Sequence, residues 1–374
     1  MGSTRIARTA AADLEGEHRR LTGTGRDTAA RLAARPAIVW GSPVRKGARP
    51  PVLVYCPCRA GIAAPGGEAQ RTDGTMRIHP ERQYLDLIER ILDTGDRRVD
   101  RTGVGTLSVF GAMLRFDLSD GTIPVLTTKK VYWKTAIKEM LWFLTGGTNI
   151  RDLLRENVRI WTDWPLARYR RETGETIDQA EFEARVLADE AFAARWGELG
   201  PVYGKQWRRW MGADGREHDQ IAEVIRLVRE NPGSRRMLFH GWNVPDLPGM
   251  ALPPCHMVYQ FHVHSSGRLN MLMYQRSGDA LLGLPFNFVG AAALQAMVAQ
   301  QADLSLGEFV WMGGDVHLYL NHLDQARMQA AREPKPLPTL QLRRRPETID
   351  GYRIEDFQVT GYDSHPAIAA DVAV

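Results

Sequence analysis

The chain has 374 residues, 44% of them hydrophobic and 25% charged, a composition typical of one large or two medium globular domains. It contains no apolar run of about eighteen residues, so we expect no membrane-spanning helix. Its start lacks the apolar segment of a signal peptide. Three cysteines, Cys56, Cys58 and Cys255, give no disulfide framework, and we therefore expect a protein of the reducing cytoplasm.

The net charge of +4 comes from the start of the chain. Residues 1–75 hold 12 basic and 6 acidic side chains, whereas residues 76–374 hold 36 and 38. The leader is rich in Ala, Arg, Gly and Pro and has little periodicity, which predicts a basic, mostly disordered extension. A general nucleic-acid-binding surface is therefore not supported for residues 76–374, where any anion site must be local.

Two special roles for this leader are disfavoured. The Cys-Pro-Cys at 56–58 could form a metal or redox pair, but no other Cys or His cluster accompanies it. The acidic residues at 13, 15 and 17 do not fit an organellar transit peptide, which is poor in acid. An organism-specific extension and a start codon assigned too far upstream both remain open.

The first periodic element follows Pro80, where apolar residues at 85, 88 and 92 recur at helical spacing. D-R-T-G-V-G-T, from Asp100, is a glycine-punctuated loop whose spacing does not fit a dinucleotide fingerprint. Two alternating runs then flank Gly111, with their apolar residues on opposite phases. This change of phase predicts a β-bulge or a sharp bend at Gly111.

A strong helix is predicted for residues 131–144, and its second half is apolar on both faces. Glu139 lies three and four residues before Trp142 and Phe143, hence beside them. A carboxylate there is either ion-paired with a buried cation or held for proton chemistry with a raised pKa.

Residues 165–199 are charged, contain helical stretches and are assigned no chemistry. G-P-V-Y-G-K-Q, from Gly200, is not a P-loop, because its spacing and its final Gln206 do not fit.

The next region contains the only cysteine outside the leader. An amphipathic helix at 221–228 precedes Arg235 and Arg236, which open a strand-like run through Val244. Neighbouring strand residues face opposite ways, so one site receives both arginines only at a bend or a strand end. The alternative is a solvated basic pair. Two prolines then impose an extended approach to Cys255. A lone cysteine is more often a small buried hydrophobe.

Residues 274–287 read Y-Q-R-S-G-D-A-L-L-G-L-P-F-N and follow a hairpin predicted at 256–274. At the end of its second strand, Arg276 and Ser277 offer a guanidinium fork and a hydroxyl that suit a phosphate. Gly283 permits close approach of a flat ligand, and Asn287 presents one amide donor beside one acceptor. The alternative is an ordinary strand end and helix start, with Arg276 in a surface ion pair.

Two elements complete the chain. Residues 286–302 predict a buried, Ala-rich helix. His317 and Tyr319 share a face if their segment is extended. A metal site with His317 and His322 is discounted, because no third ligand is apparent.

The segment at 274–287 resembles the nucleotide-binding segment of the thymidylate synthase family. The resemblance extends from Met76 to the C-terminus and includes seven further motifs in the family's order. They are D-R-T-G-V-G-T at Asp100, E-M-L-W-F-L at Glu139, I-W-T-D-W at Ile160, G-P-V-Y-G-K-Q-W at Gly200, S-R-R at Ser234, A-L-P-P-C-H at Ala251 and G-G-D-V-H-L-Y at Gly313.

The resemblance implies an α+β fold in which twisted mixed β-sheets pack back to back at a homodimer interface, with helices outside. Residues 1–75 are then an N-terminal extension, 76–374 the catalytic domain and 165–199 a variable insert. The implied reaction is the reductive methylation of dUMP to dTMP. In it, 5,10-methylenetetrahydrofolate donates the carbon and the hydride and becomes dihydrofolate. No metal, nicotinamide, membrane or nucleic acid is required.

The resemblance also implies roles in catalysis and dUMP binding. Cys255 adds to C6 of the uracil, so that C5 becomes nucleophilic, while Glu139 and Tyr203 move protons around O4 and C5. A free thiol is only a few per cent ionised at neutral pH, and nearby arginines should raise that fraction. Asn287 reads the uracil edge. The other implied dUMP residues are Arg101, Arg276, Ser277, Asp279, His317 and Tyr319, with Arg235 and Arg236 from the partner subunit.

For folate, the resemblance implies that Asp279 binds the pterin and that Lys129 meets a glutamate tail. The C-terminal segment should close over the site and exclude water. Tyr132, Gly278 and Asp371 depart from the family's usual residues. A flat ring suits a wall of aromatics with a glycine, and the remaining implied lining residues are Ile160, Trp161, Trp164, Leu252, Leu282, Gly283 and Phe286.

Two rival functions are weighed. A pyrimidine hydroxymethylase of the same fold adds water in place of hydride, and its cytosine-directed members carry Asp where this chain has Asn287. The asparagine favours uracil unless its amide is free to flip. A non-catalytic nucleotide- or RNA-binding protein would instead make Cys255 dispensable and binding dependent on the leader and on salt.

Overall fold

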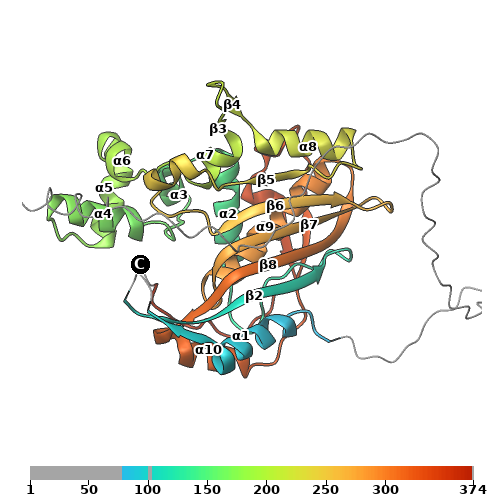
Figure 1. The fold of residues 1–374 in the computed structure, drawn as a ribbon, viewed down its shortest axis with the longest axis horizontal. Coiled ribbons are helices and arrows are strands. Elements are labelled where there is room, and N and C mark those ends of the chain that lie inside the picture. The colour runs from blue at the N-terminus through green and yellow to red at the C-terminus, as the bar shows by residue number, and fades with distance from the viewer. Residues whose placement is uncertain (1–77, 100–102, 373–374) are drawn as a thin grey trace, which may run out of the picture. The chain divides into compact units, whose positions relative to one another are not determined.

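The computed structural model describes residues 78–99 and 103–372 (Figure 1). The predictions for residues 1–75 and for Arg101 lie outside these ranges. None of the helices in these ranges has the length and apolar character needed to span a membrane.

A mixed β-sheet is the centre of the described fold. Its strand order is β1 (Asp96–Arg98), β2 (Thr106–Asp117), β8 (Ser305–Tyr319), β7 (Arg268–Asp279), β6 (His256–Val263) and β5 (Leu238–His240). β7 and β8 are parallel, and the other neighbours are antiparallel. The predicted α+β class with a mixed sheet is therefore confirmed. Two small pairs lie apart from it: β3 (Trp210–Met211) with β4 (Glu217–His218), and β9 (Thr339–Leu342) with β10 (Phe357–Thr360).

Helices of the described residues pack on one face of the sheet and beside its outer strands (Figure 1). The α-helices are α1 (Arg82–Thr94), α2 (Trp133–Leu144), α3 (Ile150–Arg155), α4 (Asp163–Thr173), α5 (Gln179–Ala188), α6 (Glu190–Trp196), α7 (Tyr203–Arg208), α8 (Gln220–Glu230), α9 (Gly283–Gln301) and α10 (Leu323–Ala330). The 3-10 helices are η1 (Val244–Gly249), η2 (Leu320–His322), η3 (Ile349–Gly351) and η4 (Ile354–Asp356).

The main core lies between α9 and one face of the sheet (Figure 1). α9 is buried almost all round because its small residues let α2 pack on its other side. Phe288 of α9 is fully buried, and its ring centroid lies 5.4 Å from that of Phe116 and 5.6 Å from that of Trp311. Such aromatic burial contributes strongly to the stability of the sheet that carries the site.

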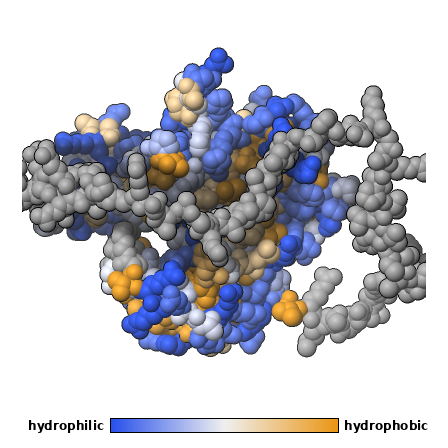
Figure 2. Space-filling model, in the orientation of Figure 1, coloured by the Kyte–Doolittle hydropathy of each residue, from blue (hydrophilic) through white to orange (hydrophobic). Residues whose placement is uncertain are grey.

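The opposite face of the sheet carries a row of apolar side chains. Met113 pairs with Met312, Met312 with Tyr274, and Tyr274 with Val258, so the row crosses four strands. Met113 is 50% exposed, and Phe110 on the same strand is 83% exposed. Figure 2 shows apolar residues over the middle of the sheet with polar residues around them. An exposed apolar patch of this kind marks an interaction surface.

Several predicted elements are confirmed, including the helix now seen as α2 and the hairpin of β6 and β7. Of the two features predicted at Gly111, a β-bulge or a sharp bend, the bulge is wrong, because β2 pairs with β8 in one register on both sides of it. The change of phase arises instead from a left-handed backbone at Gly111, with φ of 80°.

Two strand predictions also need correction. The strand-like run from residue 234 to Val244 shortens to β5, because Val244 and Pro245 begin the 3-10 helix η1. Arg276 and Ser277 lie within β7 and not at its end, since pairing with β8 continues to Asp279.

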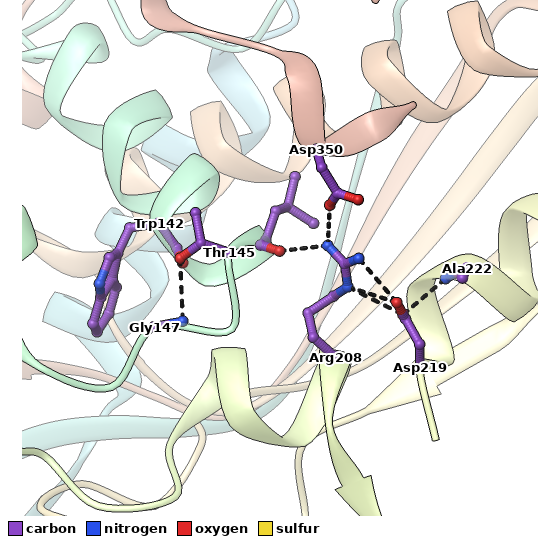
Figure 3. A network of polar contacts seen from close by, with 8 residues as sticks. Trp142, Thr145, Gly147, Arg208, Asp219, Ala222 and Asp350 are labelled. Atoms are coloured by element: carbon purple, nitrogen blue, oxygen red, sulfur yellow. Dashed lines mark hydrogen bonds and ion pairs between the residues drawn. The ribbon is translucent and has the colours of Figure 1, made fainter. Parts of the chain in front are cut away.

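Arg208 ties α7 to three other elements (Figure 3). Its guanidinium donates to the Leu144 carbonyl at the end of α2 and to Asp350 of η3. Its Nε and Nη2 also donate to the two carboxylate oxygens of Asp219, the N-cap of α8, at 3.1 Å to Oδ1 and 2.9 Å to Oδ2. A Cβ at Gly204 would lie 2.8–2.9 Å from backbone oxygens of residues 143 and 147, so α7 packs directly on the chain around the end of α2. These contacts position Tyr203 at the start of α7.

Glu81 organises the loop that precedes α2. It is fully buried, and its two carboxylate oxygens accept hydrogen bonds from the backbone N–H and the hydroxyl of both Thr127 and Thr128, at 2.6–2.9 Å. Four donors on one carboxylate satisfy a charge that would otherwise be costly to bury.

We predict that Glu81→Ala lowers the free energy of unfolding by at least about 3 kcal/mol, because it leaves four donors without an acceptor. Equilibrium denaturation in urea measures the change. Glu89→Ala is the matched control, since Glu89 forms an exposed ion pair with Arg82 and should cost less than about 1 kcal/mol. Equal losses in the two variants would contradict the assignment.

Candidate active site

The sheet topology brings most of the implied dUMP residues to one edge. Because β7 and β8 are parallel, Asp279 pairs with His317 near their carboxyl ends. β6 begins at the same edge, where His256 pairs with Gln275. α9 starts close after β7 and carries Asn287 in its first turns. Residues from four segments that are distant in sequence thus converge at this edge.

Arg276 holds the cysteine loop. Its Nε donates to the Pro254 carbonyl and its Nη2 to the Pro253 carbonyl, both at 2.8 Å. The same Nη2 lies 4.0 Å from Sγ of Cys255, and the guanidinium stands 5.3 Å from the centre of the Trp242 ring. Arg276 is therefore a fixed cation beside the thiol. Trp242 was not anticipated, because a tryptophan after a short strand carries no sequence signal for cation binding.

The pKa of the Cys255 thiol results from two opposing effects. Burial raises it, while the Arg276 charge and the hydrogen bond with Tyr203 lower it, and the net result is a raised pKa. The predicted influence of arginine on the thiol acts in the expected direction, but burial outweighs it. Cys255 is still partly exposed, so a reactant can reach the sulfur.

Tyr203 supports the same loop from below. Its hydroxyl accepts the N–H of Cys255 at 2.7 Å, and its ring stacks on His256 with centroids 4.3 Å apart. His256 also hydrogen-bonds Tyr259 at 2.9 Å, and burial lowers its pKa to about 3, so the ring is neutral at physiological pH. His256 and Tyr259 were missed as site residues because both look like ordinary members of an apolar strand.

Glu139 has an environment suited to proton transfer. Burial raises its pKa to about 7, although the indole N–H of Trp161 donates to its Oε1 at 2.7 Å and opposes the shift. Among the described residues no cation pairs with it, so the ion-pair alternative is not supported. A carboxyl with a pKa near neutrality can both give and take a proton.

The amide of Asn287 has a fixed orientation. Trp311 Nε1, which can only donate, donates to Gln275 Oε1 at 3.0 Å. The amide nitrogen of Gln275 then donates to Asn287 Oδ1 at 2.9 Å. Asn287 therefore keeps its oxygen toward Gln275 and its NH2 free for a ligand. The role of Gln275 was missed, since it is simply the inward-facing polar residue before Arg276.

His317 and Tyr319 lie on one face of β8, as predicted for an extended segment, with ring centroids 5.3 Å apart. His317 Nδ1 lies 3.0 Å from Asp315 Oδ1, which in turn lies near Arg98. The histidine contact lowers the pKa of Asp315. The ring of His317 is thus oriented by a carboxylate that the sequence did not single out.

An aromatic wall stands beside Glu139. The Trp161 ring centroid lies 5.2 Å from that of Trp164 and 6.0 Å from that of Tyr203, and Ile160 is 37% exposed on the same turn. Leu252, Leu282 and Phe286 are partly buried against the core. A Cβ at Gly283 would meet only ordinary contacts, so space is available there. This lining suits a flat ring.

Lys129 and Asp279 lie close to one another under the start of α9. Lys129 is buried, its ammonium donates to the Leu281 carbonyl, and burial lowers its pKa to about 8. Asp279 accepts the N–H groups of Leu281 and Leu282 through Oδ1. The contact of Lys129 with a folate tail stays a prediction.

Two implied residues are not gathered at this edge by any contact within the chain. Arg235 and Arg236 are exposed in the segment before β5.

The C-terminal segment is held by bonds from His365 N to Thr127 O and from His322 Nε2 to Asp371 O, both 2.7 Å. Its closure over a ligand stays a prediction.

We predict that Arg276→Met shifts the pH midpoint of Cys255 alkylation by iodoacetamide to a higher value, because the charge that lowers the thiol pKa is lost. Arg276→Lys should fall between this variant and the native protein. Peptide mass spectrometry separates Cys255 from Cys56 and Cys58. Arg268→Met, at the far exposed end of β7, is the control. An unchanged midpoint in Arg276→Met would count against the electrostatic role.

Comparison with known proteins agrees with this geometry. The family profile described as thymidylate synthase matches residues 82–374. Thymidylate synthase of Cereibacter sphaeroides (strain ATCC 17025) is 75% identical over 296 residues, which is 79% of this chain and 99% of the relative. Thymidylate synthase of Rhodopseudomonas palustris (strain BisA53) is 70% identical over the same shares, and that of Rhizobium rhizogenes (strain K84) is 67% identical over 80% of this chain and all of its own. The chain belongs to the thymidylate synthase family.

Proposed function

We propose that this protein catalyses the reductive methylation of dUMP to dTMP, with 5,10-methylenetetrahydrofolate as the donor of the methyl carbon and the hydride. The observation that carries the proposal is the half-buried Cys255 thiol beside the fixed Arg276 guanidinium, with the amide of Asn287 held in one orientation on the helix that follows the same strand. Relatives at 65–75% identity that are named thymidylate synthase support it. We propose the cytoplasm as its location.

Cys255 is the nucleophile. Its thiolate adds to C6 of the uracil, the C5–C6 electron pair moves toward O4, and C5 becomes a carbon nucleophile. Folate, when bound, would supply the one-carbon unit and then the hydride. Between these two events C5 must give up its proton to a base, and the bond from the new carbon to folate must break. Elimination of Cys255 restores the C5–C6 double bond and frees the enzyme. Burial raises the pKa of Cys255, so the thiol must give up its proton before the sulfur adds to C6.

Glu139 and Tyr203 handle protons around the base. Glu139 titrates near neutral pH, so it can protonate O4 as the enolate forms and take the proton back afterwards. Tyr203 is fully buried, and its pKa lies well above its ordinary value, so it acts as a neutral hydroxyl. Both residues lie against the aromatic wall, which excludes water from the developing charge.

Asn287 provides the choice of base. With its oxygen held by Gln275, its NH2 donates to the uracil 4-oxo group. The 4-amino group of cytosine would meet a donor in its place and leave both groups unpaired. This orientation does not favour a cytosine-directed hydroxymethylase.

The remaining dUMP contacts are proposed from the family motifs. Arg276 and Ser277, with Arg101, bind the 5′-phosphate, while His317 and Tyr319 hold the ribose. Asp279 and the aromatic wall receive the pterin. The apolar row on the open face of the sheet suits a second copy of the chain packed back to back. Arg235 and Arg236, which are exposed here, would then reach the phosphate of the other subunit.

We predict that the native protein, incubated with 5-fluoro-dUMP and methylenetetrahydrofolate, gives a covalent adduct on the peptide that contains Cys255. The fluorine cannot leave C5 as a proton does, so the complex is trapped. Mass spectrometry detects it. Cys255→Ala should bind dUMP but form neither adduct nor dTMP. Normal turnover by Cys255→Ala would refute the nucleophile.

We also predict that Asn287→Asp shifts the ratio of kcat/KM for dCMP over dUMP by at least about a hundredfold toward dCMP, because one carboxylate oxygen would face the 4-amino group. Product analysis with each nucleotide measures it. Asn270→Asp, near the start of β7 and away from the site, is the matched control. If the ratio stays the same, Asn287 does not read the base.

A further inference from the structure

Most of the variable insert forms a helical group with its own core. The ring of Tyr169 on α4 lies 5.6 Å from Phe182 of α5, and 5.4 and 5.0 Å from Phe192 and Trp196 of α6. Figure 1 shows these three helices together at one side of the described fold. Nothing in the proposed chemistry so far uses this group.

One charged side chain is buried in it. Glu183, in the middle of α5, is 3% exposed, whereas Glu181, the other acidic residue of this helix, is exposed to water. A carboxylate in such a position is destabilising unless hydrogen bonds satisfy it. Its partners therefore indicate why it is there.

Two of these partners lie on the turn that carries the aromatic wall. The Thr162 hydroxyl donates to Glu183 Oε1 at 2.8 Å, and Arg159 Nη1 donates to Oε2 at 2.5 Å. The third, Gln179 of the same helix, donates to Oε1 at 2.8 Å. The Arg159 side chain is 57% exposed and its charge is screened, whereas Thr162 is 1% exposed. The bond from Thr162 is thus the shielded anchor between the insert and the turn.

Trp161 transmits the position of this turn to the catalytic wall. It directly precedes Thr162, and its indole N–H is the donor to Glu139. Trp164 follows on the first turn of α4 and packs against Trp161. The path from insert to catalytic carboxyl is therefore Glu183, Thr162, Trp161 and Glu139, each step a hydrogen bond or a peptide link.

We propose that Glu183 is a positioning residue, which anchors residues 159–162 through Thr162 and so preforms the folate side of the active site. The inference rests on the proposed function. Glu183 contacts neither substrate. Without its anchor, the turn must be ordered by the folate itself, which weakens folate binding, while dUMP binding on the other side of the site is unaffected.

The proposal is tested with Thr162→Val, which keeps the shape of the side chain and removes only the hydroxyl. Glu183→Ala, Glu183→Gln and the double variant Thr162→Val with Glu183→Ala complete the set. Glu181→Gln, on the same helix but in an exposed ion pair with Arg185, is the matched control. The measurements are KM for methylenetetrahydrofolate, KM for dUMP, the pH profile of kcat and the Tm of each full-length protein.

We expect Thr162→Val and Glu183→Ala each to raise the folate KM about tenfold, with the dUMP KM changed less than about twofold. The pH profile should move to higher pH, because loss of the Trp161 donor removes a bond that favours ionised Glu139. The double variant should be no worse than Glu183→Ala, since the Thr162–Glu183 bond that Thr162→Val removes is already lost in Glu183→Ala. Glu183→Gln keeps an acceptor and should resemble the native protein.

A lower Tm with unchanged folate KM and pH profile would overturn the proposal and leave Glu183 a stabilising residue only. Additive effects in the double variant would overturn the path through Thr162. Absence of dTMP formation by the native protein would refute the proposed function itself. This activity is therefore measured before any variant is compared.

Discussion

One guanidinium fixes the geometry on which the candidate site depends. Arg276 extends from the last part of β7 and binds two consecutive carbonyls of the loop before Cys255, so the strand sets the position of the sulfur. The same charge opposes the effect of burial on the thiol pKa. A loop held this way needs no reorganisation when a substrate arrives, which is where preorganised sites gain their advantage.

The side chains around the Cys255 sulfur have widely different pKa values. Burial keeps His256 neutral, with a pKa of about 3, and keeps Tyr203 neutral by raising its pKa. Of the three side chains His256, Tyr203 and Glu139, only Glu139, with a pKa of about 7, changes charge near neutral pH. The same apolar wall thus produces two fixed hydrogen-bonding groups and one proton carrier, which is how buried sites assign acid and base roles.

The alternation of apolar residues and the Ser-Ser-Gly turn were enough to predict the β6–β7 hairpin, and helical spacing predicted α2. The end of β7 was misjudged because its last residues are polar and pair with β8, a contact that no local pattern reveals. The motifs named most of the candidate residues, yet Gln275, His256 and Glu183 could not be found. Each looks like an ordinary strand or helix residue until tertiary packing surrounds it.

The helical group of α4, α5 and α6, which lies in the segment predicted to vary, illustrates how a peripheral segment can be coupled to a site. The group is also hydrogen-bonded to the start of α3 through α6 and the residue after it. Asn149 Nδ2 donates to the Ala193 carbonyl, and the Ile150 N–H donates to the Gly197 carbonyl. With Glu183 anchored at the other side, the helical group is bound to α3 and to the aromatic turn. Length and surface residues of the insert are then free to change, provided that these anchors keep Trp161 on Glu139.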